Sequence, residues 1–130
     1  MTSHPGNLIC LMEDEEDIAR LISHHLQASG FRVHRPERPS TLVAEAEAHP
    51  PAVFILDLML PEIDGFELCE SIKASGILRD IPVLILTART GIADRKRAEE
   101  SGADLYMTKP FKFTELIASV QTLCEPSSSQ

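Results

Sequence analysis

The chain has 130 residues, of which 43% are hydrophobic and 25% are charged, a composition typical of one soluble globular domain. Its 20 acidic and 12 basic residues give a formal net charge of −8, which argues against nonspecific binding to the phosphate backbone of nucleic acids. No apolar run approaches the ~20 residues of a membrane span, and the 3 cysteines have neither a zinc-site spacing nor a disulfide pattern. We therefore expect a cytoplasmic domain that contacts neither nucleic acid nor a membrane.

The first third of the chain predicts two strands, each followed by a helix. The run Leu8–Met12 is apolar without interruption, which is typical of a strand buried on both faces of a sheet. The spacing of the apolar residues that follow predicts a helix that ends at Gly30. Residues 31–35 alternate apolar and polar side chains and predict a half-exposed edge strand, and Ser40 is expected to cap a short helix.

The rest of the chain repeats this alternation of short apolar runs and amphipathic stretches. In chain order, the expected elements are strand 53–56, a helix after Gly65, strand 83–86, helix 91–101, strand 104–107 and helix 113–124. Five strand–helix repeats predict an α/β domain over residues 8–124, with a five-stranded parallel, doubly wound sheet between helices. Residues 1–7, which lack the basic and apolar blocks of a secretory signal, and residues 125–130 are expected to be polar tails.

Polar side chains stand where the predicted strands end. They are Glu13 and Asp14 after the first strand, Asp57 after the third, Thr87 after the fourth and Lys109 after the fifth. Ligands of open α/β sheets bind at the carboxyl ends of the strands. We therefore expect three carboxylates, a hydroxyl group and an ammonium group to gather at one edge of the sheet.

The gathered charges predict a metal-assisted reaction of a phosphoryl group. Neighbouring carboxylates repel each other, and a hard divalent cation such as Mg²⁺ removes the repulsion. The cation and Lys109 would together neutralise charge on a transferring phosphoryl group. One carboxylate can then act as nucleophile and form an aspartyl phosphate. Asp57 is the best candidate, because the end of a central strand is a rigid position. The acidic run 13–17 is also consistent with a helix start favoured by the helix dipole, and Glu15, Glu16 and Asp17 are assigned to that role.

Four segments of the sequence resemble the receiver domain of two-component response regulators. They are Leu11–Asp14, Ile55–Gly65, Leu86–Ala88 and Tyr106–Phe111, each at the end of a predicted strand. The resemblance covers about residues 8–124. It implies a CheY-like fold with the strand order 2-1-3-4-5.

The resemblance implies a role for each matching residue of the site. Asp57 is expected to be the phosphoacceptor. Glu13 and Asp14 are expected to hold Mg²⁺ together with Asp57 and the backbone carbonyl of Met59. Lys109 is expected to pair with the phosphoryl group.

Two further residues match the switch of the family. Thr87 matches the hydroxyl group that moves to bond a phosphoryl oxygen, and Tyr106 matches the aromatic ring that turns inward as the hydroxyl moves. The peptide bond between Lys109 and Pro110 matches one that is usually cis in the family. The change would reach a face made of residues 91–124, where helix 91–101 has few large apolar residues and is expected to move easily.

As a receiver domain, the chain is expected to take a phosphoryl group from a sensor histidine kinase or a histidine phosphotransfer protein. It would catalyse only its own phosphorylation and dephosphorylation. Its output would be a downstream protein or an effector domain outside this sequence. A homodimer through the 91–124 face stays open, because Leu105 and Thr114 stand where a dimerising subfamily often has charged residues.

Three other functions are compared with this hypothesis. A flavin-binding module of the same shape would need a loop rich in Gly, Ser or Thr where this chain has the acidic run 13–17. A phosphatase with an aspartyl intermediate would need a second carboxylate two residues after the nucleophile, where this chain has Met59. A receiver-like interaction module that is never phosphorylated is the remaining alternative, and the complete set of site residues argues against it.

Overall fold

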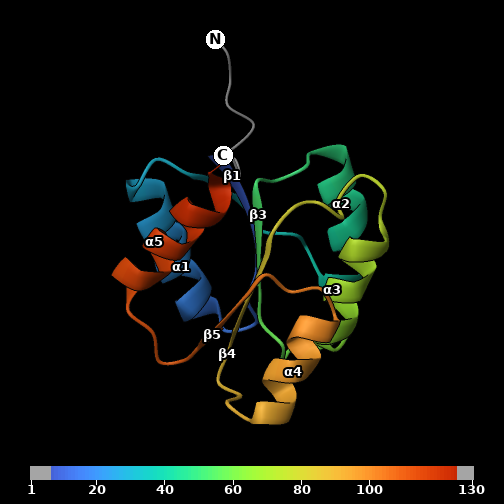
Figure 1. Cartoon of the computed structure of the whole chain (residues 1–130). Helices are drawn as coiled ribbons and strands as arrows, with labels where there is room; N and C mark the ends of the chain where they lie inside the picture. The colour runs from blue at the N-terminus through green and yellow to red at the C-terminus, as the bar shows by residue number, and fades with distance from the viewer. Residues whose placement is uncertain (1–6, 126–130) are drawn as a thin grey trace.

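The structure, a computed structural model, describes residues 7–125 and contains one five-stranded parallel sheet between two layers of helices (Figure 1). The elements are β1 (Leu8–Met12), α1 (Glu16–Ala28), β2 (Arg32–His34), α2 (Leu42–Ala48), β3 (Val53–Leu56), α3 (Gly65–Ala74), β4 (Val83–Thr87), α4 (Ile92–Glu100), β5 (Leu105–Thr108) and α5 (Phe113–Cys124). The strand order is β2-β1-β3-β4-β5, which confirms the predicted fold. Most of the two expected tails, residues 1–6 and 126–130, lies outside the described residues.

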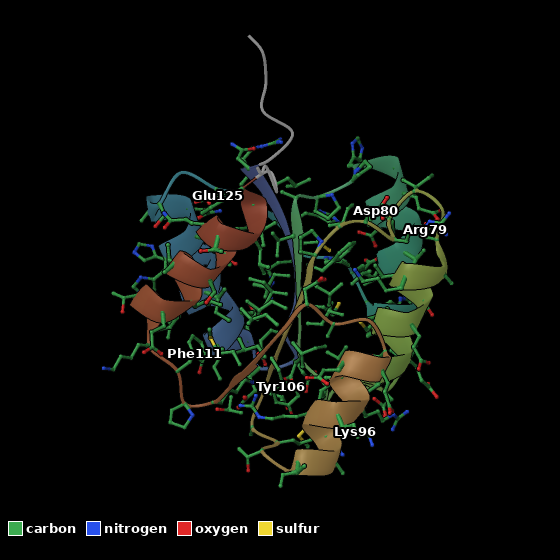
Figure 2. The ribbon with its side chains drawn as sticks, in the orientation of Figure 1. Arg79, Asp80, Lys96, Tyr106, Phe111 and Glu125 are labelled. Carbon is green, nitrogen blue, oxygen red and sulfur yellow. The ribbon has the colours of Figure 1, made fainter. Side chains whose placement is uncertain are left out.

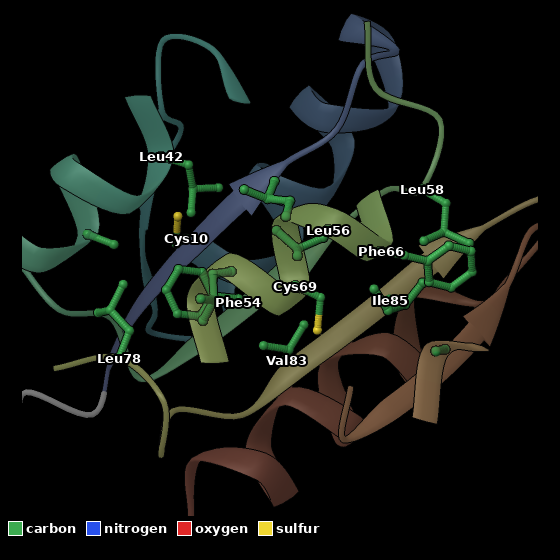
Figure 3. Packing of buried hydrophobic residues seen from close by; sticks show 14 residues of the cluster. Cys10, Leu42, Phe54, Leu56, Leu58, Phe66, Cys69, Leu78, Val83 and Ile85 are labelled. Carbon is green, nitrogen blue, oxygen red and sulfur yellow. The ribbon is translucent and has the colours of Figure 1, made fainter. Parts of the chain in front are cut away.

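The side chains of the central strands alternate between two apolar clusters, one on each face of the sheet. Figure 2 shows side chains between the sheet and the helices on both sides. In β3, Val53 and Ile55 belong to the cluster that α1 and α5 cover, whereas Phe54 and Leu56 belong to the cluster that α2, α3 and α4 cover. All four are buried, because a strand with helices on both sides has no solvent face. Figure 3 shows the second cluster, in which the rings of Phe54 and Phe66 lie among aliphatic side chains.

The outer elements follow the sequence pattern as well. In β2, Val33 is half-buried between the exposed Arg32 and His34, as expected for an edge strand. Gly30, just after α1, has a φ of 95°, a backbone conformation that glycine adopts without steric cost. Within residues 7–125, no helix combines the length and the apolar surface needed to cross a lipid bilayer.

The start of α2 differs from the prediction. Ser40, which was expected to cap this helix, lies inside a 3₁₀ turn over Pro39–Thr41, and α2 begins at Leu42. Thr41 takes the N-cap position, but its hydroxyl group donates to the carbonyl of Arg38 at 3.0 Å and does not cap the helix. The proline at the start of the turn fixes the backbone there. The helix therefore starts after Ser40.

Lys73, near the end of α3, ties this helix to the loops that lead into β4 and β5. Its Nζ atom donates to the carbonyls of Ile81 at 2.9 Å and Arg79 at 3.2 Å and to the carboxylate of Asp104 at 3.3 Å. The same carboxylate oxygen accepts a hydrogen bond from the backbone N of Val83 at 2.8 Å. One ammonium group thus holds three segments of the chain together.

We predict that Lys73→Met lowers the free energy of unfolding by about 1–2 kcal/mol, because two carbonyls and a carboxylate lose a charged donor. Urea unfolding followed by circular dichroism measures the change. Lys96→Met is the matched control, since Lys96 is exposed on α4. An equal loss in both variants would show that the contacts of Lys73 contribute nothing.

Candidate functional site

Glu13, Asp57 and Lys109 lie together at the carboxyl end of the sheet. The Nζ atom of Lys109 is 2.9 Å from Oε1 of Glu13 and 3.2 Å from Oδ2 of Asp57. Both acidic residues are buried, with 5% and 4% of their surfaces exposed. The three follow β1, β3 and β5, so the sheet brings together residues that are up to 96 positions apart. The Lys109–Pro110 peptide bond is cis, as expected.

The backbone around Asp57 fixes this residue in place. Its backbone N donates to the carbonyl of Met12 at 2.9 Å, and its Oδ1 atom accepts from the backbone N of Met59 at 3.1 Å. Gly65, the first residue of α3, packs so closely that a Cβ atom there would lie 2.6 Å from the carbonyl oxygen of Asp57. Only glycine allows β3 and α3 this approach, so the loop between them is held at both ends.

The charges of the cluster shift the protonation of its members. Burial raises the pKa of Glu13, and the charge of Asp57 raises it further, against hydrogen bonds from Lys109 and the backbone N of Glu15. Burial by itself would lower the pKa of Lys109, but Glu13 and Asp57 outweigh it and raise that pKa above its ordinary value. Lys109 therefore stays charged near neutral pH and compensates the two buried carboxylates.

Asp14 lies at the same edge of the sheet, in contact with solvent. Its side chain is exposed, and together with Glu13 it lines a cavity of about 210 Å³ whose other walls include residues 35–39. Lys109 contacts Glu13 and Asp57 but not Asp14. Within the part of the chain that the structure describes, no three Asp, Glu, His or Cys side chains form a ready-made metal cluster.

The donor atoms at this edge nevertheless fit a hard cation. Glu13, Asp14 and Asp57 offer carboxylate oxygens and Met59 offers a backbone carbonyl, and Mg²⁺ prefers oxygen ligands of this kind. The Oε1 atom of Glu13 is buried, and the close partner that it has is the Nζ atom of Lys109 at 2.9 Å. This oxygen has lone pairs to offer, so the residues present suit the cation expected from the sequence.

Thr87 and Tyr106 are linked through the backbone of Arg89, a residue that the sequence pattern did not single out. Thr87 is buried at the end of β4, and its Oγ1 atom accepts from the backbone N of Arg89 at 3.3 Å. The hydroxyl group of Tyr106 donates to the carbonyl of Arg89 at 2.7 Å. The ring of Tyr106 lies near α4, and the guanidinium of Arg95 covers it at 5.0 Å (Figure 2). The hydroxyl of β4 and the ring of β5 thus share one connecting residue.

α4 is attached to the domain by positively charged side chains that lie over aromatic rings. Only Ala98 of this helix is buried. The guanidinium of Arg97 lies 4.6 Å from the centre of the Phe66 ring and 3.7 Å from the carboxylate of Asp64, the N-cap residue of α3. One buried alanine cannot hold a helix by apolar packing, so these contacts keep α4 in place.

Residues 9–121 match the family model of the response regulator receiver domain. The chain belongs to this family. The receiver domain is 44% identical to the transcriptional regulatory protein CreB of Escherichia coli over 115 residues, which make up 88% of this chain and 49% of CreB. The chain thus spans about half the length of the curated relatives it matches.

Solved receiver domains share the fold. The receiver domain of the sensor histidine kinase PA1611 from Pseudomonas aeruginosa, which has a magnesium ion coordinated in its active site cleft, matches with a TM-score of 0.83 and 30% identity over 92% of this chain and 98% of that one. The BeF3-activated receiver domain DrrB matches with a TM-score of 0.81 and 31% identity over 92% of this chain and 97% of that one. The function is therefore that of a two-component receiver domain, and the flavin-binding, phosphatase and phosphorylation-independent alternatives are not favoured.

We predict that Arg97→Gln speeds amide hydrogen exchange in α4 by about two- to fivefold, because the helix loses a cation–π contact worth roughly 0.5–1 kcal/mol. Exchange followed by NMR measures the effect for each helix. Lys96→Gln is the control, because it removes the neighbouring charge and leaves the contact with Phe66. If α4 exchanged at the wild-type rate in Arg97→Gln, the contact would not be what attaches this helix.

Proposed function

We propose that Asp57 accepts a phosphoryl group and that the receiver domain signals through the resulting change of charge. The observation that carries this proposal is the buried carboxylate of Asp57, which shares Lys109 with Glu13 at the carboxyl end of the sheet. An oxygen of Asp57 attacks the phosphorus of a phosphohistidine, and the phosphorus–nitrogen bond breaks. The imidazole leaves with the electron pair and takes up a proton, and Asp57 becomes an aspartyl phosphate.

Magnesium would be held by the carboxylates of Glu13, Asp14 and Asp57 and by the backbone carbonyl of Met59. When bound, it supplies positive charge that offsets the charge of the phosphoryl oxygens. Support comes from the oxygen donors at this edge of the sheet, among them the buried Oε1 atom of Glu13, which lies 2.9 Å from the Nζ atom of Lys109. The magnesium ion in the related PA1611 receiver domain is a further argument for the same cation.

Lys109 pairs with the phosphoryl group on Asp57, because its Nζ atom already lies 3.2 Å from the carboxylate that is modified. Thr87 moves to bond another phosphoryl oxygen. This movement changes the hydrogen bonds that connect Thr87, Arg89 and Tyr106. The change at the end of β4 thereby reaches the face made of residues 91–124, which contains α4, β5 and α5.

The receiver domain catalyses reactions of its own side chain only. In the reverse step, water attacks the phosphorus, the bond to the Asp57 oxygen breaks, and inorganic phosphate leaves. The signal therefore lasts as long as the aspartyl phosphate survives this hydrolysis.

The receiver domain is expected in the cytoplasm, and its expected partner on the input side is a sensor histidine kinase or a histidine phosphotransfer protein. On the output side, the matching half of CreB is part of a transcriptional regulatory protein, which supports output through an effector domain or a separate downstream protein. The net charge of −8 argues that this domain does not itself contact nucleic acid. Formation of a homodimer through the 91–124 face is a further possible output of the domain.

We predict that a small acyl phosphate and Mg²⁺ add the mass of one phosphoryl group to the chain. Asp57→Asn gains none because the nucleophile is lost, and chelation of the metal by EDTA strongly lowers the wild-type gain. Intact-mass spectrometry measures each case. Asp64→Asn is the matched control, because asparagine also caps helices and residue 64 does not contact Lys109. An equal gain in Asp57→Asn would contradict the assignment.

Tyr106 provides an optical test of the switch, because the chain has 1 tyrosine and 0 tryptophans. We predict that beryllofluoride, a phosphoryl mimic, changes the fluorescence of Tyr106 in the presence of Mg²⁺. The reason is that the hydrogen bond from the Tyr106 hydroxyl group to Arg89 is part of the connection between the site and this ring. Asp57→Asn abolishes the change. Thr87→Val, which keeps the shape of the side chain but loses the hydroxyl group, reduces it severalfold. If Thr87→Val gave the full fluorescence change, Thr87 would have no part in the connection between the site and Tyr106.

A further inference from the structure

Lys109 has a third carboxylate partner outside the buried pair. The Oε1 atom of Glu15 lies 3.3 Å from the Nζ atom of Lys109, which also contacts Glu13 and Asp57. The side chains of Glu13 and Asp57 are 1% and 6% exposed, whereas the side chain of Glu15 is 64% exposed. Glu15 is therefore the partner of Lys109 that lies at the solvent-facing rim of the site.

Glu15 occupies the N-cap position of α1, but its side chain does not cap the helix. The sequence pattern assigns Glu15 to the start of a helix and to no other role. In the structure its carboxylate instead contacts Lys109, which is 94 positions away in the sequence. Its backbone N donates to Oε2 of Glu13 at 3.0 Å. Both the backbone and the side chain of Glu15 therefore take part in the arrangement of the site.

We propose that Glu15 is a positioning residue that competes with the phosphoryl group for Lys109. This inference rests on the proposed function of Asp57. Glu13 and Asp57 are the expected metal ligands, so a bound cation neutralises the attraction that they exert on the ammonium group. Glu15 is not an expected ligand and keeps its negative charge. Lys109 then has to break its contact with Glu15 before it can pair with the phosphoryl group.

The direction of the effect follows from the other partners of Lys109. Without Glu15, the ammonium group still has its buried partners Glu13 and Asp57, so it stays at the site. What is lost is a negative charge close to the position that the phosphoryl group will occupy. Because Glu15 is mostly exposed, solvent weakens its influence, and we expect an effect of about two- to fivefold on binding.

The test measures the affinity of the full chain for beryllofluoride by isothermal titration calorimetry in saturating Mg²⁺. Glu15→Gln removes the charge and keeps the size of the side chain, and we expect it to bind the mimic about two- to fivefold more tightly than wild type. Asp17→Asn is the matched control. It removes one charge from the first turn of the same helix, and Lys109 does not contact Asp17.

Two further measurements separate this role from a purely structural one. At about 1 M salt the gain of Glu15→Gln should largely disappear, because charges a few ångströms apart in solvent are then screened. A titration with Mg²⁺ alone should show no gain in affinity for Glu15→Gln, because the loss of a negative charge does not favour the binding of a cation.

The outcomes separate this inference from the proposed function. An unchanged or weaker affinity in Glu15→Gln would overturn it, and so would an equal gain in Asp17→Asn, because net charge alone would then explain the result. If wild type and both variants bound no beryllofluoride, the proposed function of Asp57 itself would fail.

Discussion

The site depends on one ammonium group that two buried carboxylates share as their counter-charge. An ionised carboxylate without a partner is costly at the end of an apolar strand, and Glu13 and Asp57 end the neighbouring strands β1 and β3. Lys109 follows β5, which is separated from β3 by β4. Its side chain therefore has to reach across the end of β4 to bring its charge to the carboxylates. The long, flexible stem of a lysine can span this distance, and the ordering of the five strands makes the contact possible.

Because the buried pair shares one counter-charge, any ion that binds there changes the partners of Lys109. In the proposed function, a divalent cation on the carboxylates would take over the role of counter-charge, and a phosphoryl group on Asp57 would then attract the released ammonium group. Binding of the cation and acceptance of the phosphoryl group would therefore be coupled through a single side chain. Glu15, whose Oε1 atom lies 3.3 Å from the Nζ atom of Lys109 at the rim of the site, would take part in the same competition.

Much of the fold and the centre of the site could be predicted from local sequence. Strands covered on both faces have to be apolar throughout, and the shared edge of parallel strands brings Asp57 and Lys109 together. The start of α2 could not be predicted from Ser40, because the proline turn decides which residue precedes the helix. The contacts of Glu15 and Arg89 were missed for a different reason. The direction of an exposed side chain or a loop carbonyl is set by groups far away in the chain, such as the hydroxyl of Tyr106.

α4 shows how a weakly attached element is placed next to a rigid one. The close approach of Gly65 to Asp57 fixes the start of α3, and with it the positions of Asp64 and Phe66. α4 rests on these two residues through Arg97, a contact worth roughly 0.5–1 kcal/mol, whereas burial of one leucine contributes about 1.5–3 kcal/mol. These magnitudes decide which helix can move. α3 would have to expose several buried side chains, while α4 would expose one alanine and exchange contacts with a ring for contacts with water. A change at the end of β4 therefore displaces α4 more easily than α3. The physical reason is the polar sequence of α4, which leaves one buried side chain to expose.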